Sequence, residues 1–279
     1  MDKIKRAIEE SKRHRSITRQ DQIPNELVSD NTVSIGAEMF DEIDINVEYE
    51  QTRVISVNPE YLAKNRIVTF NKNNKLSLGF DFLRTQVIDK MTKHGWRTMA
   101  ITSPTPTCGK TMVAINLAMS IAHHTSRTAM LVDFDLRRPT IAKYLGLPSK
   151  PSLNDILVNK ATISESLINP GLERLVILPT ANPVKNSSEV LSSRKVTKLI
   201  NGLRERYTER IVMFDLPPIL SSDDAMIMLA QVDCVLVVVG NGMVSKTDLI
   251  ESMRYVDQTK LLGTVLNKSN SIQRQSGYN

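Results

Sequence analysis

The sequence predicts an α/β protein with a mostly parallel central sheet and helices on both of its faces. Short, almost continuously apolar segments alternate with longer helix-length segments. Strands that are covered on both faces have this composition, and strand–helix alternation is typical of parallel sheets with right-handed crossovers. The predicted strands span residues 97–103, 128–134, 174–179, 210–216, 233–240 and 261–267, and the predicted helices span 110–124, 187–206, 222–230 and 245–258.

Length and composition are those of a globular protein with a core of useful size. The chain has 279 residues, of which 41% are hydrophobic and 24% are charged, so wholesale disorder is excluded. No apolar run approaches the roughly 18 residues that span a bilayer. The charged N-terminus does not fit a signal peptide, and two cysteines are too few for a disulfide framework. We therefore expect a cytoplasmic protein.

The basic charge is concentrated at the N-terminus. The net charge is +6, and residues 1–20 supply +4 of it, with seven Lys or Arg against three Asp or Glu. Aromatic residues make up only 5%, and the basic–aromatic interleaving of single-strand binders is missing. Nucleic acid is therefore not expected as a partner. A basic segment suits a membrane surface or an acidic partner equally well.

The chain divides into three parts that differ in polarity and in their pattern of apolar residues. Residues 1–70 are polar and predict a basic N-terminal helix followed by a partly ordered arm. Residues 71–270 carry the strand–helix rhythm and form the predicted α/β domain. Residues 271–279 form a short tail that contains Tyr278.

A phosphate-binding loop follows the first core strand. Gly109, Lys110 and Thr111 stand where the chain must turn from strand into helix. The unpaired N–H groups and the positive dipole end of a helix start suit a phosphate. Lys110 can reach the outer phosphates and the Thr111 hydroxyl can hold Mg²⁺. The loop departs from the common pattern, since Pro104 stands where the first glycine would be; the alternative is an ordinary connection with a surface lysine.

Carboxylates follow two further strands at the same predicted sheet edge. Asp133 and Asp135 lie two apart, so they share a face at the tip of the second strand. Asp215 ends the fourth strand and is expected to hold Mg²⁺ directly or through water. Turn and capping roles are the alternative, most of all for Asp135. Lys110, Thr111, Asp133 and Asp215 are thus expected to meet at one Mg²⁺–nucleotide.

Two further features belong to these sheet-edge motifs. Pro139 follows the second strand and fits the first residue of a helix. Asn267 ends the last strand, where it would contact a nucleotide base or merely form a turn.

The segments SPTPTCGKT, AMLVDFDLRRP and IVMFDLPP together read as Walker A, Walker A′ and Walker B motifs. In this combination the chain resembles the bacterial tyrosine kinases that regulate capsule and exopolysaccharide synthesis. It is most similar to their short cytoplasmic branch. The likeness runs from about residue 78 to residue 269 and includes FLRTQV, INPGLERLVILP and LLGTVLNKS. These kinases are P-loop proteins of the deviant Walker type, related to septum-positioning and plasmid-partition ATPases.

The resemblance implies ATP and Mg²⁺ as cofactors and an autokinase activity. Lys110, Asp133, Asp135 and Asp215 would be catalytic, and Thr111, Asp133 and Asp215 would hold the metal. Nucleotide contacts would come from Pro106, Thr107, Cys108, Gly109, Lys110, Thr111, Met112 and Asn267. Asp133 would assist at the metal or accept the tyrosine proton.

The resemblance also implies where the protein works and with what. Tyr278 would be the phosphorylated residue, with transfer between neighbouring subunits. A membrane polysaccharide copolymerase would activate the kinase and hold it at the inner face of the membrane. Further copies of the chain and a tyrosine phosphatase would be additional partners.

Three positions depart from the family pattern. Thr107-Cys108 replaces Gly-Glu in the loop. If a positive φ is needed there, a β-branched residue costs roughly 1–2 kcal/mol, which is about a tenfold loss in ATP affinity. The run E-x-x-R-x-x-R is represented by Leu78, Asp81 and Arg84, so only its last arginine remains. The tail holds one tyrosine where the family has a cluster. An ATPase switch and a catalytically weakened nucleotide-sensing regulator therefore remain alternatives to the kinase.

Overall fold

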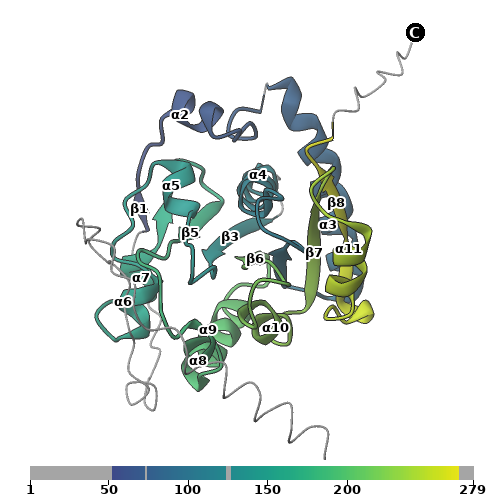
Figure 1. The fold of residues 1–279 in the computed structure, drawn as a ribbon. Coiled ribbons are helices and arrows are strands. Elements are labelled where there is room, and N and C mark those ends of the chain that lie inside the picture. Colours follow the sequence, from purple (N-terminus) through teal and green to yellow (C-terminus); the bar gives the residue numbers. More distant parts are fainter. Residues whose placement is uncertain (1–51, 73, 124–126, 270–279) are drawn as a thin grey trace, which may run out of the picture. The chain divides into compact units, whose positions relative to one another are not determined.

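A single mixed sheet organises the part of the chain that the structure describes. The computed structural model describes residues 52–72, 74–123 and 127–269. Their eight-stranded sheet has the order β1-β4-β5-β3-β6-β2-β7-β8 (Figure 1). Its strands are β1 Arg53–Val54, β2 Thr98–Thr102, β3 Thr128–Asp133, β4 Ile168–Asn169, β5 Leu175–Leu178, β6 Arg210–Asp215, β7 Cys234–Gly240 and β8 Leu261–Asn267. Neighbouring strands are parallel except β4 and β5, which confirms the predicted fold class.

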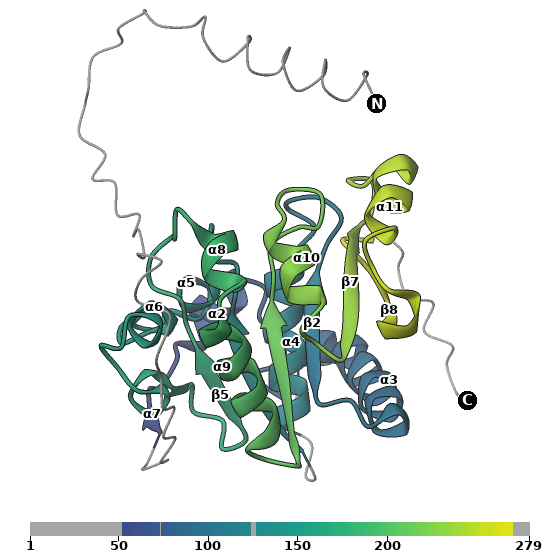
Figure 2. The same cartoon turned by 90° about the horizontal axis from the view of Figure 1, so that it is seen from below.

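Helices cover both faces of this sheet. One layer consists of α2 Pro59–Lys64, α3 Leu78–His94, α4 Lys110–Ala122 and α5 Ile141–Leu145. The other contains α6 Leu153–Leu157, α7 Ile163–Ser166, α8 Ser187–Leu191, α9 Arg194–Glu205 and α10 Asp224–Leu229. Figure 2 shows α8, α9 and α10 on the near side of the sheet. Each layer has its own apolar core, because every central strand presents buried side chains to both faces.

Helix α4 is the most deeply buried of these helices, since nearly all of its residues are enclosed. It packs between the sheet and α3 and contacts β3 most extensively. A helix that is apolar on all sides must be enclosed in this way. The tight packing of α4 therefore fixes the position of the loop that precedes it.

Several elements differ from the expectation. The predicted helix 187–206 is two helices, because Ser193 caps α9: its hydroxyl accepts a hydrogen bond from the N–H of Val196 at 3.3 Å. The predicted helix 245–258 ends at Met253, as α11 Lys246–Met253. Pro139 is not the first residue of a helix, since α5 starts at Ile141 after its N-cap Thr140.

Residues 52–70 belong to the folded part, although the sequence assigned them to an arm. Val57, Leu62 and Ile67 are buried in the same core as α4. The two-residue strands β1 and β4 are too short to show a periodic pattern, so they were not predicted. The expected basic N-terminal helix and Tyr278 lie outside the described residues.

Candidate functional site

The loop between β2 and α4 has the backbone that a phosphate-binding loop needs. Gly109, the N-cap of α4, has φ 89°, and Thr107 has φ 65°. A Cβ on Gly109 would meet the Nδ2 of Asn267 and would be strained at this φ, so the position favours glycine. The Cys108 thiol is buried and donates to the carbonyl of Thr105 at 3.2 Å. The buried thiol of Cys108 therefore stabilises the loop from its inner side, and the opposite side of the loop faces the edge of the sheet.

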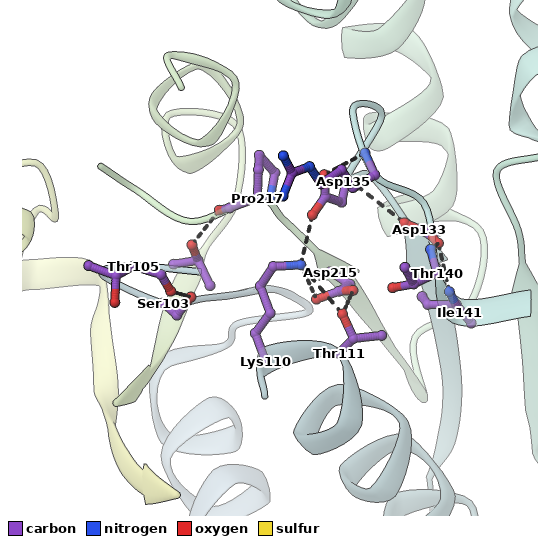
Figure 3. A network of polar contacts seen from close by, with 12 residues as sticks. Ser103, Thr105, Lys110, Thr111, Asp133, Asp135, Thr140, Ile141, Asp215 and Pro217 are labelled. Atoms are coloured by element: carbon purple, nitrogen blue, oxygen red, sulfur yellow. Dashed lines mark hydrogen bonds and ion pairs between the residues drawn. The ribbon is translucent and has the colours of Figure 1, made fainter. Parts of the chain in front are cut away.

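Lys110 and two carboxylates form the centre of the site (Figure 3). The Nζ of Lys110 donates to Oδ2 of Asp135 at 2.8 Å and lies 3.6 Å from Oδ1 of Asp215. Lys110 stands in the first turn of α4, whereas Asp135 follows β3 and Asp215 ends β6. The neighbouring strands β3 and β6 pair Asp133 with Asp215, which brings the carboxylates to one edge.

Burial and charge act against each other at Lys110. Burial disfavours its ammonium form, but the carboxylates of Asp215 and Asp135 outweigh this effect and raise its pKa. Burial also raises the pKa of Asp215, partly offset by Lys110 and by the hydroxyl of Thr111. The site thus keeps a permanent positive charge beside acidic oxygens that lack the usual hydration.

Thr111 and Asp215 fit the requirements of a magnesium site. The Thr111 hydroxyl donates to Oδ2 of Asp215 at 2.6 Å. Oδ1 of Asp215 is buried and has no hydrogen-bond partner. The ammonium of Lys110 lies 3.6 Å from this oxygen, an ion-pair contact too long for a hydrogen bond, so Oδ1 keeps an acceptor position for a further ligand. Hydroxyl and carboxylate oxygens are ligands that Mg²⁺ prefers, so these two residues fit the predicted metal.

Asp133 has backbone partners that the sequence did not reveal. Its Oδ2 accepts hydrogen bonds from the N–H groups of Thr140 and Ile141, both at 2.9 Å. Its Oδ1 accepts one from the N–H of Asp135 at 3.3 Å. Burial and the nearby charge of Asp215 raise its pKa. Asp133 therefore fixes the start of α5 and the loop that carries Asp135.

Arg137 also has partners at the same edge. Its Nε donates to Oδ2 of Asp224 at 3.0 Å and to the hydroxyl of Ser187 at 3.1 Å. It therefore joins the loop after β3 to the first turns of α8 and α10.

Asn267 closes the site from the last strand. Its Nδ2 donates to the carbonyl of Cys108 at 2.8 Å, and its own carbonyl accepts from the N–H of Asn241 at 2.9 Å. A cavity of about 530 Å³ lies beside it, within the size range of small-molecule sites. Of the residues predicted to contact nucleotide, its walls include Thr107, Gly109, Lys110, Thr111, Met112 and Asn267. Pro106 is exposed and Cys108 faces the interior, and neither lines this cavity.

The same cavity has walls that sequence reasoning missed. Lys64, Asn65 and Arg66 line it, together with Thr140 and Tyr144. They lie far from the loop in sequence, so motif spacing could not find them. The one signal was the helix start at Asn58-Pro59, where an Asn N-cap precedes proline.

The fold and the site define the chain as a P-loop protein with a cavity beside the loop, at the carboxyl ends of its strands. It belongs to the AAA domain family, whose model matches residues 96–269. The matched range contains the loop, both carboxylate motifs and Asn267.

The chain is similar to several bacterial tyrosine kinases. It is 28% identical to the tyrosine-protein kinase YwqD of Bacillus subtilis over 220 residues, which is 78% of this chain and 92% of that protein. It is 28% identical to the tyrosine-protein kinase Wzc of Salmonella typhimurium over 82% of this chain but only 30% of Wzc. The crystal structure of the chimerical protein CapA2B2 matches with a TM-score of 0.68 and 27% identity, over 79% of this chain and 95% of that one.

These relatives confirm the predicted resemblance to bacterial tyrosine kinases and, at the level of the family, the predicted enzyme class. The septum site-determining protein MinD of Pyrococcus horikoshii, solved with Mg-ADP, shares the fold at 23% identity and a TM-score of 0.51. No helix among the described residues has the length and apolar character needed to cross a membrane.

Proposed function

We propose that this protein is an ATP-dependent protein-tyrosine kinase that phosphorylates Tyr278 in the C-terminal tail of a neighbouring copy of the same chain. The observation that carries the proposal is the placement of Lys110 between Asp135 and Asp215 at the start of α4. Phosphoryl transfer needs mainly positioning and neutralised charge. A buried cation beside a carboxylate that fits Mg²⁺ meets this need. The similarity to tyrosine-protein kinases also supports the proposal.

The residues of the site divide the work. The N–H groups of the loop and Lys110 would hold the phosphates, and Thr111 and Asp215 would hold Mg²⁺, which supplies charge neutralisation when bound. The tyrosine oxygen forms the new P–O bond while the bond to ADP breaks. The phenol proton would pass to Asp133 or to the neighbouring Asp135. Asp133 accepts hydrogen bonds from backbone N–H groups, and Asp135 accepts them from Lys110 and from the N–H of Arg138.

The biological setting belongs to the same proposal. The kinase would control the chain length or export of a capsular or extracellular polysaccharide. It would work at the inner face of the membrane, through a membrane copolymerase that activates it. Other copies of the chain would be its substrates, and a tyrosine phosphatase would remove the phosphate by hydrolysis.

The test is incubation of the purified protein with Mg²⁺ and labelled ATP, followed by mass spectrometry of the C-terminal peptide. Wild type is expected to carry label on Tyr278, and Lys110→Ala is expected to lose it, because the phosphates lose their buried counter-charge. Tyr278→Phe should abolish the tail label. Tyr255→Phe, which removes an exposed tyrosine outside the tail, should not.

The reaction is run with and without the cytoplasmic tail of a copolymerase. Release of phosphate without label would favour the ATPase switch. Nucleotide binding without either reaction would favour the weakened regulator. Loss of label in only one of the variants Asp133→Asn and Asp135→Asn would identify the carboxylate that takes the proton, and full label in both would contradict a role for either.

A further inference from the structure

The segment 52–69 runs from the edge of the sheet to the nucleotide cavity. It starts as β1, which pairs with β4 in parallel, and the N–H of Ile55 donates to the carbonyl of Asn169 at 2.9 Å. It then forms α2, capped by Asn58, whose side chain accepts from the N–H of Glu60 at 2.9 Å. Leu62 of this helix is almost fully buried. The fold therefore fixes the path of this segment.

One buried side chain of α4 fastens the end of the segment. The Oδ1 of Asn116 accepts from the N–H groups of Val68 and Thr69 at 2.8 and 3.1 Å. Its Nδ2 donates to the carbonyl of Arg66 at 3.0 Å and to that of Met112 at 2.9 Å. Asn116 is fully enclosed. The segment is thus bonded to the helix whose first turn carries Lys110 and Thr111.

A second contact fastens α2 to α5 and to the glycine that ends it. The hydroxyl of Tyr61 donates to the carbonyl of Lys143 at 2.8 Å, and its ring packs over Gly146. Both fastenings hold the turn between α2 and Ile67 against the cavity. Figure 1 shows α2 beside α5, on the same side of the sheet as α4.

The turn held in this way presents cations to the cavity. Lys64, Asn65 and Arg66 form one part of its wall, and the phosphate loop forms another. Lys110 and Lys268 also line it, and among the described residues no carboxylate does. Arg66 has φ 60°, a left-handed conformation that an arginine adopts only when its surroundings impose it. This chain therefore holds exposed cations at the opening of the phosphate site.

We propose that Arg66 and Lys64 bind the phosphates of the nucleotide, so that the segment 58–67 is a second wall of the nucleotide site. The inference rests on the proposed nucleotide binding at the loop. Guanidinium and ammonium groups form charge-assisted hydrogen bonds with phosphate oxygens, and Arg does so in a bidentate way. Asn116 is the positioning residue that links this wall to α4.

The test measures the affinity of the full chain for Mg-ATP by calorimetry. Arg66→Asn removes the charge and keeps a residue that tolerates positive φ. Lys64→Gln removes the second charge. Each is expected to weaken binding by about three- to tenfold, the size of a partly exposed charge contact. Arg66→Lys should lie between wild type and Arg66→Asn. Lys198→Gln, an exposed lysine of α9 on the other face of the sheet, is the charge-matched control and should bind as wild type does.

Two further measurements separate the outcomes. Inorganic triphosphate is used as a competitor. The substitutions should weaken the binding of triphosphate by the same factor as the binding of ATP. A loss for ATP alone would overturn the assignment to phosphates. Hydrogen exchange of the peptide containing residues 62–69 should slow when Mg-ATP is added to wild type, and unchanged exchange would contradict a contact.

Lys110→Ala distinguishes this inference from the proposed function. If Lys110→Ala abolishes binding while Arg66→Asn and Lys64→Gln bind as wild type does, the second wall is wrong and the nucleotide site stands. If wild type binds no nucleotide, both fail. Should Arg66→Asn not fold, as judged by its thermal melt, Arg66→Gly replaces it, because glycine adopts positive φ without strain.

Discussion

Thr107 carries backbone strain inside the phosphate loop. Its φ of 65° is one that β-branched residues rarely adopt, so the positive φ considered from the sequence is present at this position. The sequence argument placed the cost in ATP affinity. The structure places it in the folded protein, which already holds Thr107 in this conformation.

The replacement Thr107→Gly is therefore expected to stabilise the protein. Relief of the left-handed strain gains about 1–2 kcal/mol, and the greater freedom of glycine in the unfolded chain takes back roughly 0.4–1 kcal/mol. A net gain near 0.5–1 kcal/mol should appear in urea unfolding. Thr107→Ala keeps a Cβ at positive φ and should show no comparable gain. Equal stability of Thr107→Gly and Thr107→Ala would show that the loop is not strained at this residue.

Single residues of the site were predictable where a motif fixes the backbone around them. Lys110, Thr111 and Asp215 were found because each stands at a strand or helix end that the apolar pattern reveals. Arg66 was not, because its position depends on one hydrogen-bonding side chain, Asn116, which is 50 residues away. Contacts of this kind leave no local pattern in the sequence.

Lys195 joins two short elements of the layer that contains α9. It is buried at the start of α9, and its Nζ donates to the carbonyl of Leu157 at 2.6 Å and to Oδ1 of Asn159 at 2.7 Å. A cation at a helix N-terminus is also disfavoured by the dipole. Burial lowers the pKa of Lys195 to about 8.

This lowered pKa predicts how stability depends on pH. In the unfolded chain a lysine has a pKa of about 10.4, above the value in the fold. Below pH 8 Lys195 is protonated in both the folded and the unfolded chain, so the folded protein bears the full free-energy cost of burying the charge. Between about pH 8 and 10.4 the unfolded state binds more protons, so this lysine makes stability rise with pH. Urea unfolding at pH 7 and 9.5 should show this rise in wild type relative to Lys195→Met. Identical pH dependence of the two proteins would contradict it.

Elements were predictable in proportion to their length. The buried strands β2, β3, β6 and β7 show continuous apolar character, and all were located. The half-exposed edge strand β8 and the shorter buried strand β5 were located by the same apolar character. The short elements α5, α6 and α7 have five residues or fewer, below the length at which a helical period is visible or a helix is stable alone. Tertiary packing and capping hold them, as the capping box of Ser152 and Asp155 does for α6.

For the whole molecule, the open question from the sequence was assembly through the remnant of the E-x-x-R-x-x-R run. In the structure Arg84 is used within the chain: its Nη1 donates to Asp81 at 2.8 Å and to the carbonyl of Ser120 at 3.3 Å. It thereby joins α3 to α4. At the first position of the run, Leu78 is exposed and apolar.

We therefore expect Arg84→Ala to change stability and not assembly. Loss of a half-buried ion pair and of a bond to a buried carbonyl should cost about 1–3 kcal/mol in urea unfolding. The mass measured by sedimentation equilibrium should equal that of wild type at the same concentration. Lys93→Ala breaks an exposed ion pair with Asp89 on the same helix and should cost well under 1 kcal/mol. An Arg84→Ala protein with the stability of wild type but a smaller mass would show that this arginine acts between subunits, because only a contact across an interface can change mass without changing the fold of one chain.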